Sequence, residues 1–204
     1  EIGHIGGKNS TKEELVSFIE GFNRCFKSEI GLSKVSVQTG THHGGTPLDD
    51  GNLADVKVDF ETLKKLSRVE RKYKMGGAVQ HGASTLPEKY FPEFPKTEAI
   101  EIHLGTGFQN IIMNHSKFPK EFLNKIYNWL DKERKKEKGN QTQAQFYYNL
   151  RKKGWGEFKK ESWSLPKKTK ETILKDLEKK FNFIFKTLNV ENTKNLINKY
   201  EGKN

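Results

Sequence analysis

The sequence predicts an α/β fold, half of an eight-stranded barrel of parallel strands followed by an all-helical extension. Up to about residue 112, segments of strand character alternate with segments of helical spacing, and each strand-like segment ends near glycine and a polar residue. From about residue 113 only helical patterns follow. Strands that alternate with helices pair in parallel through right-handed crossovers. We therefore expect a barrel part at residues 1–112 and a helical extension at residues 113–204.

Helices are expected on both sides of the boundary. Ser10 and Glu13 have the spacing of a capping box, and apolar residues then recur at helical spacing in "LVSFIEGFNRCF". A second helix is expected to begin at Asp59 or a neighbour, in "DFETLKKLSRV". The extension is expected to hold helices in "PKEFLNKIYNWLDKERKK", "AQFYYNLRKK" and "KETILKDLEKKFNFIFKTLNV".

Four strand-like segments carry residues that can bind a metal ion near their ends. The segments are "EIG" at the start of the chain, "VSVQT", "GAVQHGAS" and "AIEIHLGTG", and the residues are Glu1, His42 or His43, His81 and His103. The carboxyl ends of parallel strands meet at one edge of a sheet. A carboxylate with two or three imidazoles there is a zinc-type ligand set with a position left for substrate. The alternative is that each histidine only makes hydrogen bonds within its loop.

The stretch "VSVQTGTHHGGTP" holds two adjacent histidines, of which at most one is expected to act at the site. In a strand, the side chains of neighbouring residues point to opposite faces. The other histidine then packs beside the site. The glycines next to these histidines would let backbone N–H groups approach a phosphate.

Composition limits the class of protein. The net charge is +11, and most of the excess lysine lies in the C-terminal half, interleaved with acids at helical spacing. This pattern is typical of solvated helix faces, and no nucleic-acid motif accompanies it, so we rank a nucleic-acid partner last. A single cysteine excludes a disulfide framework and fits a reducing compartment, here the cytoplasm. No apolar run has the length of a membrane span, so we expect no membrane partner.

Four motifs together resemble one enzyme family. "EIGHIGGKN", "TGTHHGG", "VQHGAST" and "EIHLGTGFQN" are similar, in that order, to the ends of strands five to eight of the class II, zinc-dependent fructose-bisphosphate aldolases, and more narrowly to a bacterial aldolase-like branch. The resemblance covers residues 1 to about 115. It implies that the first part is the C-terminal half of a (β/α)8 TIM barrel. It also implies a lyase of carbohydrate metabolism acting on fructose 1,6-bisphosphate or a related ketose phosphate.

The resemblance assigns roles to individual residues. It implies that zinc or another divalent metal is bound by Glu1, His43 and His81, so that His42 is the neighbour rather than the ligand. It further implies phosphate or substrate contacts from Gly44, Gly82, Ser84 and Thr106, and a monovalent cation as a further cofactor. In such enzymes the metal polarises the ketone and stabilises an enediolate, which adds to an aldehyde or is released by carbon–carbon cleavage.

The chain departs from the family pattern at its catalytic candidates, Asn9 and His103. Asn9 stands where the family has an acid that moves the proton, so a base must come from Glu13 or a histidine. His103 stands where the family has an asparagine, and it is a substitute base, a substrate contact or a hydrogen-bonded loop residue. These departures leave a second reading open, a non-catalytic relative that binds a sugar phosphate or a metal.

The resemblance also implies an incomplete site, because the family's third zinc histidine and catalytic aspartate lie on strands that precede this segment. A half barrel standing alone would expose open sheet edges. We therefore expect the chain to work with the missing barrel half or as a homodimer.

Overall fold

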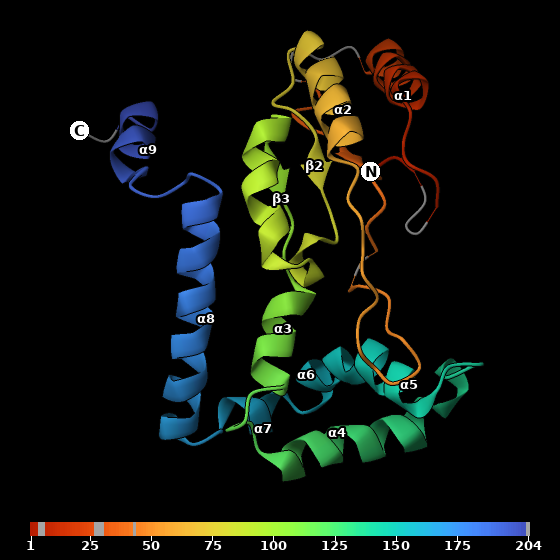
Figure 1. Cartoon of the computed structure of the whole chain (residues 1–204), viewed down its shortest axis with the longest axis vertical. Helices are drawn as coiled ribbons and strands as arrows, with labels where there is room; N and C mark the ends of the chain where they lie inside the picture. The colour runs from red at the N-terminus through yellow and green to blue at the C-terminus, as the bar shows by residue number, and fades with distance from the viewer. Residues whose placement is uncertain (4–6, 27–30, 43, 203–204) are drawn as a thin grey trace.

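A computed structural model describes residues 1–3, 7–26, 31–42 and 44–202 as helices gathered around a small parallel sheet (Figure 1). The α-helices are α1 (Lys12–Cys25), α2 (Phe60–Lys72), α3 (Thr106–Met113), α4 (Lys120–Glu133), α5 (Gln143–Leu150), α6 (Gly154–Glu157), α7 (Lys159–Trp163), α8 (Lys167–Thr187) and α9 (Lys194–Tyr200). Four 3₁₀ segments join them: η1 (Ala83–Thr85), η2 (Glu88–Thr97), η3 (Lys135–Glu137) and η4 (Arg151–Lys153).

The sheet of the described residues has three two-residue strands, β1 (Ser36–Val37), β2 (Val79–Gln80) and β3 (Glu101–Ile102). Their order is β1-β2-β3, and both pairs are parallel. The expected parallel pairing is therefore confirmed for these strands. Helix α2 connects β1 to β2, and η2 lies in the connection from β2 to β3.

The predicted half barrel is wrong. Among the residues that the structure describes, helices make up 58%, whereas strand makes up only 4%. The expected fourth strand at residues 1–3 is not formed, although the Ile2 N–H donates one hydrogen bond to the Ser36 carbonyl at 2.9 Å. Left-handed backbone limits β2, because Gly77 before it has φ +123° and Gly82 after it has φ +70°. Such residues interrupt regular extended backbone, although the Gly76 N–H still donates to the Ser33 carbonyl at 2.9 Å.

The start of the first helix also differs from the prediction by one residue. Thr11 is the N-cap and forms the capping box with Glu14, in place of Ser10 and Glu13. The reason is that the buried Ser10 hydroxyl is used elsewhere. Its Oγ accepts a hydrogen bond from the Gln38 N–H at 2.9 Å and so ties the loop to the end of β1. The second helix begins as predicted, with Asp59 as its N-cap.

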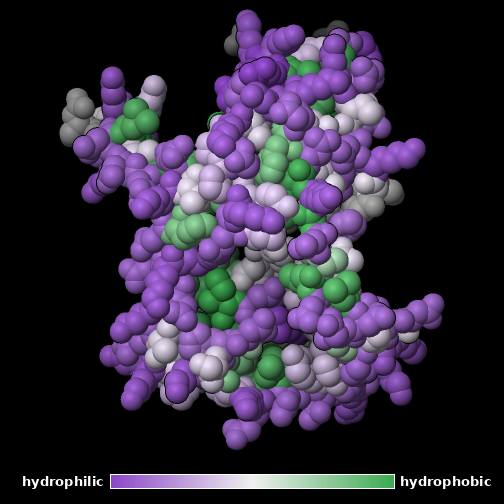
Figure 2. Space-filling view, in the orientation of Figure 1, coloured by the Kyte–Doolittle hydropathy of each residue, from purple (hydrophilic) through white to green (hydrophobic). Residues whose placement is uncertain are grey.

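Two apolar clusters form the core, and α8 contributes to both. The first joins the sheet, α1, α2 and η2, and the second joins α4 and α5 with the segments that follow them. Ile184 of α8 lies in the first cluster and Ile173 of α8 in the second. Figure 1 shows α8 running back past α3 toward the sheet. In Figure 2, hydrophobic atoms of this face gather in patches along the middle of the molecule and on α9, between hydrophilic margins.

Within the part of the chain that the structure describes, no helix combines the length and the apolar character needed to cross a membrane.

Candidate functional site at the carboxyl edge of the sheet

An open pocket of about 600 Å³ lies where β2 and β3 end. The residues that line it are Gly44, His81, Gly82, Ser84, Ile102, His103, Leu104, Gly105, Thr106 and Lys152. Six of them were candidate site residues from the sequence: Gly44, His81, Gly82, Ser84, His103 and Thr106. The parallel strands therefore bring the ends of separate motifs to one place, as the order of the strands requires.

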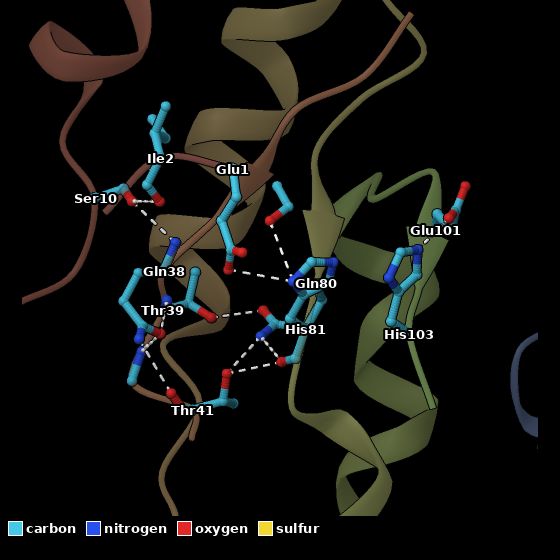
Figure 3. A network of polar contacts seen from close by, with 12 residues as sticks. Glu1, Ile2, Ser10, Gln38, Thr39, Thr41, Gln80, His81, Glu101 and His103 are labelled. Carbon is cyan, nitrogen blue, oxygen red and sulfur yellow. Dashed lines mark hydrogen bonds and ion pairs between the residues drawn. The ribbon is translucent and has the colours of Figure 1, made fainter. Parts of the chain in front are cut away.

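Glu1 and His81 meet beside this pocket (Figure 3). The Glu1 Oε1 lies 3.2 Å from the His81 Nδ1, and the Ser36 Oγ lies 3.5 Å from the same nitrogen. The His81 ring also stacks on the ring of His103, with a centroid distance of 4.4 Å. Contacts of the His81 imidazole thus join the start of the chain to β1 through Ser36 and to the end of β3 through His103.

His103 is oriented by a carboxylate from its own strand. Its Nε2 is hydrogen-bonded to the Glu101 carboxylate, which also pairs with the Lys34 ammonium. The Lys34 hydrogen bond, followed by the His103 hydrogen bond, holds the pKa of Glu101 below its usual value. The Glu101 carboxylate is therefore ionised at neutral pH and can accept the hydrogen bond that orients the His103 ring.

A buried amide supports the loops that carry His81 and the glycines. Gln80 is fully buried in β2, and its Oε1 accepts a hydrogen bond from the Thr39 hydroxyl at 2.6 Å. Its Nε2 donates to the Thr41 Oγ1 at 2.9 Å and to the His81 carbonyl at 2.6 Å (Figure 3). These residues were not among the candidates from the sequence. The signal for them was polar side chains inside strand-like runs, which must find partners when they are buried.

The loop glycines allow very close backbone approach. A Cβ on Gly82 would lie 2.8 Å from the His42 carbonyl oxygen, and one on Gly107 would lie 2.1 Å from the Ser84 carbonyl oxygen. The Gly107 N–H, in the first turn of α3, donates to the Ser84 Oγ at 3.0 Å. The loop after β2 and the start of α3 are therefore held together beside the pocket.

Asn9 does not line the pocket. Its Nδ2 donates to the Asp59 Oδ2 at 2.8 Å, so the side chain supports the N-cap of α2. Glu13, the alternative base, is exposed in the first turn of α1. Among the described residues, the candidate bases next to the pocket are accordingly the histidines.

The metal ligands implied by the resemblance are described in part. His43 lies outside the described residues. Within the described ranges, no group of three or more histidine, cysteine, aspartate or glutamate side chains forms a metal site. Two zinc ligands in a tetrahedral site are about 3.3 Å apart, given metal–ligand distances of about 2.0–2.1 Å. The 3.2 Å between the Glu1 Oε1 and the His81 Nδ1 is close to that spacing and is also the length of the hydrogen bond between these two groups.

No known protein-family model matches the chain, and no curated protein matches it. Its function is therefore inferred from the pocket and its residues.

Proposed function

We propose that the chain is an aldolase-like carbon–carbon lyase that binds a phosphorylated ketose in the pocket at the end of β2 and β3. One observation carries the proposal. Residues from three separate motifs line the same pocket, and Glu1 from a fourth motif contacts one of them, His81. These motifs were grouped by their resemblance to one enzyme family, and their common position at one sheet edge supports the proposal that they form one site.

Metal binding in this proposal depends on Glu1, His81 and His43. The spacing of Glu1 and His81 suits two ligands of one divalent ion. His43 is followed directly by Gly44, which lines the pocket. A divalent metal held there would supply Lewis-acid polarisation of the substrate carbonyl.

Proton transfer in this proposal belongs to His103. The imidazole lines the pocket, and the Glu101 carboxylate, hydrogen-bonded to its Nε2, fixes its orientation. A base must lie within hydrogen-bond reach of the proton that it removes. In the cleavage direction His103 takes the proton of the hydroxyl on the carbon that becomes the aldehyde. As the carbon–carbon bond breaks, its electron pair passes to the fragment that bears the carbonyl. Transfer of the proton from His103 to the carbon of that fragment then gives the ketone product and restores the base.

A second candidate function is binding of a sugar phosphate without turnover. The specific observation in its favour is that no carboxylate is among the described lining residues, and the Asn9 amide is engaged with Asp59. A module of this kind would keep the phosphate contacts and lack the acid–base step.

Zinc affinity and cleavage of fructose 1,6-bisphosphate test the proposal, measured on the purified chain with and without added zinc. We expect His81→Gln to weaken zinc binding by at least about tenfold. His103→Gln should lower the cleavage rate by about 10²–10⁴-fold with zinc binding unchanged. His115→Gln is the matched control, because His115 pairs with Asp176 and is not a lining residue of the pocket.

The outcomes separate the two candidate functions. Zinc-dependent cleavage that is lost in both pocket variants supports the lyase. Binding of the sugar phosphate without cleavage by any variant supports the binding module. If the unaltered protein, His81→Gln and His115→Gln bind zinc with the same affinity, the proposed metal site is contradicted.

A further inference from the structure

One residue that lines the pocket, a lysine, carries a positive charge that no motif predicted. We propose that Lys152, supplied by the helical extension, binds the phosphoryl group of the ligand. The phosphorylated nature of that ligand rests on the proposed function. Lys152 lines the pocket together with Ser84, Gly105 and Thr106. It carries the one permanently charged side chain among the described lining residues.

The three residues of the basic run "RKK", Arg151 to Lys153, have different environments. Lys153 pairs with Glu137 at 2.5 Å and belongs to a surface ion pair. Arg151 is buried, and its guanidinium donates to the Asn114 Oδ1 at 2.6 Å and the Asn110 Oδ1 at 2.7 Å. Lys152 makes no ion pair with the residues that the structure describes. Its ammonium is therefore available to an anion in the pocket.

One face of the helical segment 142–152 fixes Lys152 relative to the glycine loop. The Thr142 Oγ1 donates to the Asp49 carbonyl at 2.9 Å, and the Gln145 Nε2 donates to the Pro47 carbonyl at 3.0 Å. The Tyr148 hydroxyl donates to the carbonyl of Gly44 at 2.7 Å. Positions three or four residues apart share one face of a helix, and Lys152 continues this series.

The same helix is also tied to α3, which carries Thr106. Asn110 of α3 donates from its Nδ2 to the Tyr148 hydroxyl at 3.0 Å and accepts from Arg151. Lys152 follows Arg151 directly, so its backbone is held at a fixed distance from the start of α3. The backbone that carries this exposed lysine is thus placed before a ligand binds, which lowers the entropy cost of ordering the site.

The chemistry around Lys152 suits a phosphate monoester. The Ser84 Oγ accepts a hydrogen bond from the Gly107 N–H, so its own hydrogen remains to donate. The Thr106 hydroxyl belongs to the same pocket wall. Two hydroxyl donors and one ammonium match the several acceptor oxygens and the charge of a phosphoryl group. No carboxylate among the described lining residues opposes that charge.

The test uses inorganic phosphate as the probe and the full chain. Its dissociation constant is measured by calorimetry or by amide chemical shifts, without metal and without substrate turnover. We expect Lys152→Gln to weaken phosphate binding by about tenfold or more, the loss of one charge-assisted contact. Lys153→Gln removes the same charge one residue away and should change the constant less than about twofold, since its partner is a surface carboxylate. Lys152→Arg should keep most of the affinity.

The outcomes distinguish this inference from the proposed lyase. A specific loss in Lys152→Gln supports the anion site, and it does so even if no ketose phosphate is cleaved. Equal losses in Lys152→Gln and Lys153→Gln would show a general charge effect and overturn the inference. Absence of phosphate binding to the unaltered chain would also overturn it. Neither of these two results would decide whether the chain cleaves a ketose.

Discussion

At the scale of single residues, Glu70 is a buried carboxylate that the proposed chemistry does not use. It lies on α2 with no exposed surface, and its Oε2 accepts from the Val35 N–H at 3.0 Å. Its Oε1 has no hydrogen-bond partner among the described residues. Burial raises the pKa of Glu70 from 4.5 to about 7, and the Val35 hydrogen bond opposes this rise only in part. The folded chain therefore binds a proton more tightly at Glu70 than the unfolded chain does.

This pKa predicts a loss of stability as the pH rises. Between the unfolded and folded pKa values the folded state holds more protons, so the free energy of unfolding falls with increasing pH. Between pH 5 and pH 8 the fall from Glu70 alone should be about 2.5 kcal/mol. We expect Glu70→Gln to remove this slope. Urea unfolding of the unaltered protein and of Glu70→Gln at pH 5 and pH 8 measures this slope. An identical pH dependence of the free energy of unfolding in the two proteins would contradict the prediction.

From side-chain type and chain punctuation the sequence could place candidate residues near strand ends, whereas the roles given to them stay predictions. Gly44, His81, Gly82, Ser84, His103 and Thr106 line one pocket because each lies just after a strand or opens the following helix. Lys152 was not foreseen, since a lysine in a basic helical run has the pattern of a solvated residue. Its position in the pocket depends on contacts between α5 and the glycine loop, which are distant in the sequence.

At the scale of elements, the turn after β2 depends on Gly82. Its φ of +70° is a left-handed conformation, and an added Cβ would meet the His42 carbonyl oxygen at 2.8 Å. We expect Gly82→Ala to lower the free energy of unfolding by about 2–4 kcal/mol, from the strained backbone and the close contact together. Chemical denaturation measures this loss.

Gly139 provides the matched control for that substitution. It also has a left-handed φ, +53°, but no described atom lies within 4 Å of its added Cβ. Gly139→Ala should therefore cost about 1–2 kcal/mol, the backbone term alone. If the two substitutions lower the free energy of unfolding by the same amount, the contact with His42 does not contribute to the effect of Gly82→Ala.

Prediction of elements was uneven for a physical reason. Helices α1, α2, α4, α5 and α8 were expected because apolar spacing is a local signal, and α1 and α2 also begin with side-chain caps. The parallel direction of β1, β2 and β3 was also expected, from their alternation with helical segments. The short length of the strands was not, since a run such as "VSVQT" has strand character whether or not a partner is long enough to pair with all of it.

At the scale of the whole molecule, the sequence could not decide whether strands close into a barrel. Closure requires neighbours on both edges of the sheet, with strand number and tilt that agree. These requirements concern contacts between segments that are far apart in the sequence. The four motifs contain no information about such contacts. The return of α8 to the first cluster could not be predicted from local sequence pattern either. Ile173 and Ile184 are both isoleucines of one helix, yet they lie in different clusters.

Helix α8 is therefore expected to make the two clusters unfold together. Ile184 is 4% exposed in the first cluster, and Lys180 of the same helix pairs with Glu88 of η2 at 2.7 Å. Truncation of a buried isoleucine removes its apolar contacts and leaves a cavity. We expect Ile184→Ala to lower the free energy of unfolding by about 2–4 kcal/mol. Leu174→Ala is the control on the same helix, because Leu174 is 58% exposed, and it should cost less than about 0.5 kcal/mol.

The shape of the transition tests the coupling itself. If α8 joins the clusters, tryptophan fluorescence and far-ultraviolet circular dichroism should give one coincident denaturation curve for the unaltered chain. Of the three tryptophans, Trp129 and Trp155 pack against the second cluster, so fluorescence follows mainly that part. In Ile184→Ala the fluorescence midpoint should fall although the substituted residue lies in the first cluster. An unchanged fluorescence midpoint beside a lowered dichroism midpoint would mean that the two clusters unfold separately.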